Sequence, residues 1–234
     1  QERGERKALS PGHSRAVIEG IEPLNHLWRF NRGWLLDSQV RESLAYAVAG
    51  TPTFATIPKG LSPTVFPRAF WELRAVVELA PTVYLVADYL DQTQKHFVRF
   101  HVAHEQVNSA GNQVSTDIEA ACHLKIIPLL PVEPPTLSVD RPTNIAKIPQ
   151  EITTAVEYRG VTGPWSLFLL AALPLGETVK IFRASDAILV TTGDKTTRIE
   201  LRAHGLLEVS REGDPHHVVL DAETLLGQLR AGSR

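Results

Sequence analysis

The sequence predicts an α+β fold: antiparallel β meanders in two halves, with a short helical N-terminal part and a C-terminal helix. Three observations predict it. Short runs alternate apolar with polar residues and are separated by turn-forming residues, as in antiparallel sheets. A stretch with six prolines, 128–149, divides these runs into two groups. Apolar residues at helical spacing lie near both ends of the chain.

The N-terminal part is expected to be helical after a flexible arm at residues 1–13. Helices are predicted at Ser14–Leu27 and Asp37–Ala49. In the second, the apolar residues keep the i, i+4, i+7, i+8 spacing of one helical face, Asp37 can cap the first turn, and Gly50 follows the last. Residues 14–127 therefore combine these helices with the first meander.

The first meander is predicted from alternation over three or four strands. The expected strands are Phe70–Leu79, Thr82–Leu90, Lys95–Val107 and Val114–Ile127. The first of them also fits a helix, and strand is favoured because the segments after it alternate. Asn108–Gln113 contains a Gly-Asn pair, which suits a hairpin loop. After it, the prolines of 128–149 remove backbone donors and favour extended chain. We therefore expect 128–149 to be a linker or a strap that crosses between the two halves.

The second half, residues 150–234, is predicted to be an antiparallel sheet followed by a terminal helix. The expected strands are Ile152–Tyr158, Val179–Arg183, Ala187–Thr192, Thr196–Arg202, Leu206–Arg211 and His217–Leu220. The apolar segment Trp165–Leu173 fits either a helix or a buried strand. The last helix, Ala222–Arg230, is capped by Asp221.

Composition sets limits on the class of protein. The chain has 234 residues, 43% of them hydrophobic and 21% charged, which is typical of a folded soluble protein. A net charge of −2 argues against a broadly basic surface for nucleic acid. Cys122, the single cysteine, excludes an intrachain disulfide and is expected to be a buried, inert thiol.

The hydropathy of the chain and its first residue bear on its location and on whether it is a fragment. No apolar run approaches the ~20 residues of a membrane helix, so no membrane span is expected in this chain. A cytoplasmic location is favoured over a periplasmic one. The chain contains no methionine, not even at position 1, which is consistent with a fragment of a longer protein.

Motifs for catalysis, metals or nucleotides are absent from the local sequence, and no cofactor is expected. His101, His104 and Glu105, with the Cys122-His123 pair, form the best candidate for a metal site. On a strand, however, positions 101 and 104 point to opposite faces. Ordinary surface histidines are the favoured interpretation, and a metal-dependent enzyme is kept as an alternative.

Basic residues in the second half form the candidate contact site. Lys180, Arg183, Arg198 and Arg202 lie on neighbouring predicted strands and can share one solvent-exposed face. Such a stripe could contact phosphates or a partner protein. The alternative is a solvated sheet face with interleaved carboxylates.

A short motif resembles a known family. Gly163-Pro164-Trp165-Ser166-Leu167-Phe168, followed by three strands, is similar to the Gly-Pro-Trp-Ala-Leu-Phe segment in the IcmF-type (TssM) component of type VI secretion. This resemblance implies a non-enzymatic envelope assembly protein. The arrangement of two meandering halves joined by a strap also resembles sliding-clamp processivity factors.

The sequence thus favours a non-catalytic protein–protein interaction or assembly module of a larger complex, with a protein partner or a second copy of itself. Sheet edges open to β-augmentation support this hypothesis. A nucleic-acid-associated protein of clamp-like plan, using the four basic residues, is the alternative, and a metal-dependent enzyme is the third hypothesis.

Overall fold

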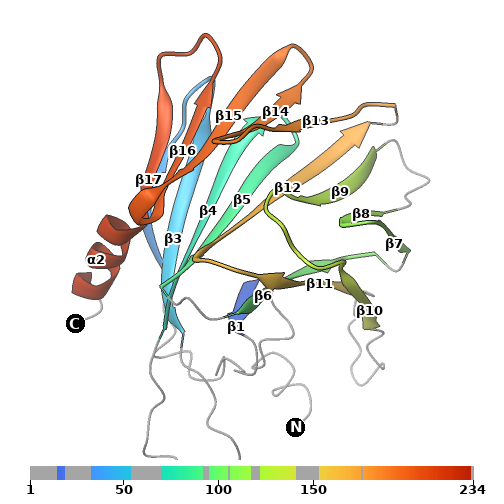
Figure 1. Ribbon diagram of the computed structural model, residues 1–234, viewed down its shortest axis with the longest axis horizontal. Helices are drawn as coiled ribbons and strands as arrows, with labels where there is room; N and C mark the ends of the chain where they lie inside the picture. Colours follow the sequence, from blue (N-terminus) through green and yellow to red (C-terminus); the bar gives the residue numbers. More distant parts are fainter. Residues whose placement is uncertain are drawn as a thin grey trace, which may run out of the picture.

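The computed structural model describes residues 15–18, 33–53, 70–91, 95–104, 106–116, 122–140, 153–174 and 176–232. These residues form antiparallel β-structure in three sheets, with a single α-helix, α2 (Ala222–Gly232), near the C-terminal end of the described part (Figure 1). The predicted α+β class with a helical N-terminal part is therefore wrong, and the fold is essentially all-β. Across the described ranges, no helix is long and apolar enough to cross a membrane.

The largest sheet has eight strands in the order β2-β3-β4-β5-β12-β9-β8-β7. Their bounds are β2 Trp34–Gln39, β3 Ala45–Thr53, β4 Phe70–Ala80, β5 Val83–Leu90, β12 Trp165–Pro174, β9 Cys122–Pro128, β8 Gln113–Thr116 and β7 Val107–Ala110. The apolar segment that fitted either a helix or a strand is the inner strand β12. It pairs with β5 on one side and β9 on the other, so stretches before and after the proline-rich region share one sheet.

A five-stranded sheet covers one face of the eight-stranded sheet (Figure 1). Its strands are β13 Lys180–Arg183, β14 Ile188–Thr192, β15 Lys195–Arg202, β16 Leu206–Arg211 and β17 His217–Asp221. Leu167 and Leu169 of β12 share a buried cluster with Val190 and Ile199 of this sheet. Helix α2 adds Leu226 to the same core. The strands and the terminal helix predicted for this region are confirmed.

A four-stranded sheet covers the opposite face of β12. Its strands are β1 Arg15–Ile18, β6 His96–Val102, β11 Thr153–Val161 and β10 Thr136–Asp140. Phe168 of β12 makes ring contacts with Phe100 of β6 at 5.1 Å and with Tyr158 of β11 at 4.9 Å, measured between centroids. Successive side chains of β12 point to opposite faces of the sheet, and both faces are covered. Its sequence is therefore almost continuously apolar. The eight-stranded sheet is the middle of three layers.

The two helices predicted in the N-terminal part are strands where the structure describes them. Arg15–Ile18 is strand β1, paired with β6, and residues 19–27 lie outside the described ranges. Asp37–Ala49 contains the end of β2, a turn and the start of β3, which pair as a hairpin. Leu44 and Val48 are both buried. A spacing of four residues fits one helical face, but it also fits one face of a strand.

In the first meander, β4 and β5 match two predicted strands, but the prediction is wrong for the other two and for the strand order. Lys95–Val107 holds β6 and only the first residue of β7, and Val114–Ile127 holds parts of two strands, β8 and β9. β4 and β5 pair as predicted, and β7 and β8 form a hairpin around Gly111 and Asn112. Strand β6, which follows β5 in the sequence, pairs within the four-stranded sheet. Strand β12 pairs with β5 in its place. Within the proline-rich stretch, β10 pairs with β11. Residues 141–149 and the predicted arm at 1–13 lie outside the described ranges.

Candidate ligand-binding surfaces

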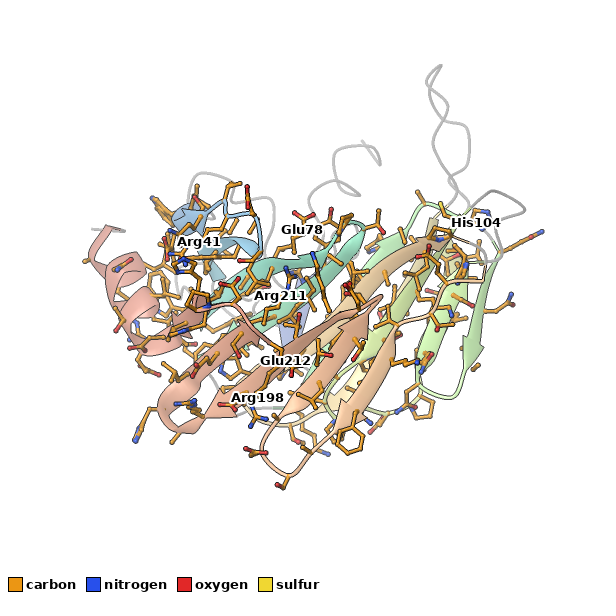
Figure 2. All side chains as sticks on the ribbon, turned by 90° about the horizontal axis from the view of Figure 1, so that it is seen from above. Arg41, Glu78, His104, Arg198, Arg211 and Glu212 are labelled. Atoms are coloured by element: carbon orange, nitrogen blue, oxygen red, sulfur yellow. The ribbon has the colours of Figure 1, made fainter. Side chains whose placement is uncertain are left out.

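The predicted basic stripe is divided between the two faces of the five-stranded sheet. Lys180, Arg198 and Arg202 alternate with inward-facing core residues and so lie on the outer face. Figure 2 shows Arg198 on this sheet. Arg183 is directed inward instead, where its guanidinium donates to the backbone carbonyls of Pro128 (3.1 Å) and Leu129 (3.3 Å). Three of the four predicted residues therefore share a face.

Carboxylates compensate the arginines of this outer face. Arg198 pairs with Asp186 at 2.6 Å and with Glu200, and Arg202 pairs with Glu200 and Glu208 at 2.8 Å each. Hydrogen bonds from Arg202 and Arg198 hold the pKa of Glu200 below its ordinary value. Three carboxylates thus face two guanidiniums. The clamp-like, nucleic-acid-binding function stays a prediction, and the outer face offers it no excess of positive charge.

A cavity of about 470 Å³ lies between the eight-stranded sheet and strand β6 of the four-stranded sheet. We call it the sheet pocket, and its lining consists of Arg74, Val76, Tyr84, Val86, Phe100, His101, Val102, Leu124, Ile126 and Leu170. The floor is aliphatic, and polar atoms are few. Pockets of this composition bind the body of a ligand by apolar contact and orient it with a few polar groups.

One wall of the sheet pocket is fixed by a buried ion pair. Arg74 on β4 and Asp88 on β5 are cross-strand neighbours, with Nε–Oδ1 and Nη2–Oδ2 distances of 2.6 and 2.8 Å. Asp88 is fully buried, whereas the Arg74 side chain is 27% exposed. Burial alone would lower the pKa of Arg74, but the neighbouring carboxylate raises it above its ordinary value. The two hydrogen bonds of the pair therefore hold the guanidinium at the pocket wall.

The candidate metal ligands are dispersed. His101 lines the sheet pocket, whereas His104 follows the end of β6 and bonds through Nδ1 with the backbone of Gln106. Glu105 is outside the described ranges. Among the described residues, no group of three or more His, Cys, Asp or Glu side chains could hold a metal ion. Cys122 begins β9 and is exposed, so the expectation of a buried thiol is wrong.

Sequence reasoning missed the sheet pocket because its residues come from distant strands. Arg74 and Tyr84 are on adjacent strands, but Phe100 and His101 arrive from another sheet. The available signal was Arg74 itself, a charged residue within a strand that is otherwise largely buried. Charged side chains are rarely placed in such strands without a partner.

The fold defined above is a three-layer antiparallel β-structure, and it is shared with known enzymes. Heparan sulfate lyase HepC from Pedobacter heparinus is similar with a TM-score of 0.55 and 10% identity, over 81% of this chain and 30% of that chain. A heparinase III gene product with methylated lysines gives a TM-score of 0.56 and 10% identity, over 91% of this chain and 30% of that chain. At these identities the likeness shows the fold alone.

The chain spans about 30% of the length of those lyases. No family model and no curated protein matches the sequence. These findings do not test the resemblance to the IcmF-type secretion component, which stays a prediction. The shared part is therefore a β-structural portion of larger proteins, and their activity is not thereby an activity of this chain.

Proposed function

We propose that this chain is the β-sheet module of a larger polysaccharide-degrading protein and that it binds an acidic polysaccharide, such as heparan sulfate, at the sheet pocket. One observation carries the proposal. The likeness to heparan sulfate lyase HepC and to a heparinase III gene product extends over 81–94% of this chain but only 30–31% of theirs. Most of this chain is matched, but only about a third of each larger protein is. This relation is expected between a single domain and a multidomain protein that contains a similar domain.

The chemistry of the sheet pocket supports binding of a saccharide. A sugar ring has apolar C–H faces and a rim of hydroxyl groups. Tyr84, 37% exposed, offers an aromatic face and a hydroxyl beside an aliphatic floor. The Arg74–Asp88 pair adds a fixed polar wall. This combination can contact both the faces and the rim of a ring.

The test is binding of the chain to immobilised heparan sulfate, with neutral dextran as the negative control. We expect Tyr84→Ala to weaken binding about tenfold, because truncation of an interface aromatic costs 1–2 kcal/mol. Phe182→Ala is the matched control, since Phe182 is 64% exposed on the outer face. Equal affinity for dextran and heparan sulfate, or an equal loss in both variants, would refute the proposal.

A protein–protein contact is the second candidate, in line with the assembly function expected from the sequence. The observation that favours it is the edge strand β13, which no described strand pairs on its outer side and which exposes Phe182. Self-association would be seen as a concentration-dependent mass in sedimentation experiments, and Phe182→Asp is expected to abolish it. A concentration-independent monomer mass would exclude self-association as the role of this edge.

A further inference from the structure

We infer that a second cleft, at one end of the two packed sheets, binds a small hydroxylated ligand through an anionic group, either a carboxylate or a sulfate. The cleft has a volume of about 470 Å³ and is separate from the sheet pocket. It lies where the β2–β3 loop and the β4–β5 turn meet the β14–β15 turn and the end of β16. We call it the end cleft. Figure 2 labels three side chains that line it, Arg41, Glu78 and Arg211.

Three cations from three separate elements line the end cleft: Arg41, Lys195 and Arg211. Neither Arg41 nor Lys195 has an ion pair or side-chain hydrogen bond within the part of the chain that the structure describes. Arg211 spans the two sheets, because its Nη2 donates to the backbone carbonyl of Leu79. Its Nε is buried and has no acceptor among the described residues. A buried donor without an acceptor is destabilising, and an oxygen atom of a ligand that accepts from it would remove this cost.

The same cleft also holds carboxylates that are kept apart from these cations. Glu42, Glu78 and Asp194 line it, yet the described residues show no ion pair between any of them and the three cations. The outer face is the opposite case, since Arg198 and Arg202 are both closely paired there. In the end cleft, the cations and the carboxylates are therefore both available to contact a ligand.

This mixed lining defines the ligand. The cations suit a carboxylate or sulfate, for which guanidinium groups offer charge-assisted, bidentate hydrogen bonds. The carboxylates accept hydrogen bonds and therefore suit hydroxyl groups beside the anionic group. An anion without hydroxyl groups would bind the cations but would be repelled by the carboxylates. A sugar acid, which carries one anionic group on a hydroxylated ring, matches both.

The elements around the cleft are tied to one another, so the site is formed before a ligand arrives. Ser43 of the β2–β3 loop and the backbone N–H of His216 both lower the pKa of Asp214 in the β16–β17 turn, so the loop and the turn lie close together. The backbone N–H of Glu212 donates to the carbonyl of Thr196 at 3.0 Å. A preformed site binds with less loss of conformational entropy than one that must be ordered.

The experiment is calorimetry of the chain with glucuronate, with glucose as the neutral control and inorganic sulfate as the bare anion. We expect glucuronate to bind, glucose not to bind, and sulfate to compete weakly. Arg41→Ala and Lys195→Ala should each weaken glucuronate binding about tenfold, the loss of one charge-assisted contact. Arg202→Ala, which removes an arginine from the outer face, should leave the affinity unchanged.

The inference is overturned if glucuronate binds no better than glucose, or if Arg202→Ala weakens binding as much as Arg41→Ala does. Thermal unfolding checks that each variant is folded; Arg41 is a half-buried residue of the β2–β3 loop, and Lys195 is the exposed first residue of β15. The heparan sulfate assay identifies the source of the ligand. If Arg41→Ala also weakens binding to heparan sulfate, the ligand of the end cleft is an acidic unit of the polysaccharide. If the affinity for heparan sulfate is unchanged, the ligand is a free sugar acid. Tyr84→Ala should leave glucuronate binding intact, so failure at the sheet pocket is distinguishable.

Discussion

Replacement of Asp88 by alanine tests whether the buried ion pair fixes the middle of the eight-stranded sheet. Asp88 is fully buried on β5 and accepts two hydrogen bonds from Arg74, at 2.6 and 2.8 Å. Alanine would leave the guanidinium partly buried and would remove the acceptor of both bonds. The methyl group cannot replace either of them.

The expected loss follows from the burial of the two partners. Breaking a buried pair by removing one member typically costs 3–5 kcal/mol. Because the Arg74 side chain retains 27% exposure, water can reach part of its guanidinium. The lower end of the range therefore applies, and we expect Asp88→Ala to reduce the free energy of unfolding by about 3 kcal/mol.

Urea unfolding followed by tryptophan fluorescence measures this loss. With a slope of about 2–3 kcal/mol per molar urea, the midpoint should fall by about 1 M. The matched control is the double variant Arg74→Met/Asp88→Leu, which removes both charges and should recover most of the loss. A loss below about 1 kcal/mol for the single variant, or a double variant as unstable as the single one, would refute the reasoning.

Three further substitutions test local features of the structure. Ser166→Ala should stabilise the chain by about 1 kcal/mol in urea unfolding, because the buried hydroxyl of Ser166 has no hydrogen-bond partner in the described structure; a destabilised variant would contradict this. Asp221→Ala should cost about 1 kcal/mol, since its carboxylate caps α2 through the backbone N–H groups of Glu223 and Thr224; unchanged stability would exclude the cap. Burial raises the pKa of Glu157, but hydrogen bonds from Arg99 outweigh this effect and lower it below the ordinary value of 4.5. The stabilisation is therefore complete above that value and is lost as pH falls through the folded-state pKa. Glu157→Gln should be less stable than the parent chain at pH ~7, and the difference should shrink as the pH falls below the ordinary value; a pH-independent difference would contradict the assignment.

Local signals predicted the C-terminal sheet well, because neighbouring strands there are also neighbours in sequence. The β13–β17 strands follow one another around short turns, so alternation and turn residues were sufficient. The cap at Asp221 was predicted on the same basis and is present. Among the described strands, none from a distant part of the chain pairs with this sheet.

The predictions of N-terminal helices and of the strand order were wrong because pairing between segments distant in sequence determines both. Leu44 and Val48 are four residues apart, a spacing that helices and strands share, and the pairing of β3 with β4 selected the strand. β12 takes the place beside β5 from about 80 residues away, which no local pattern encodes. The sheet pocket and the end cleft were missed for the same reason, since both join residues of separate sheets.

The most direct test of the proposed function is a titration of the isotope-labelled chain with a heparan sulfate oligosaccharide, followed by NMR. The account predicts chemical-shift changes at Tyr84, Phe100 and His101 of the sheet pocket, with Phe182 on the outer face unaffected. Changes confined to the outer face around Arg198 and Arg202, or no changes at all, would contradict it.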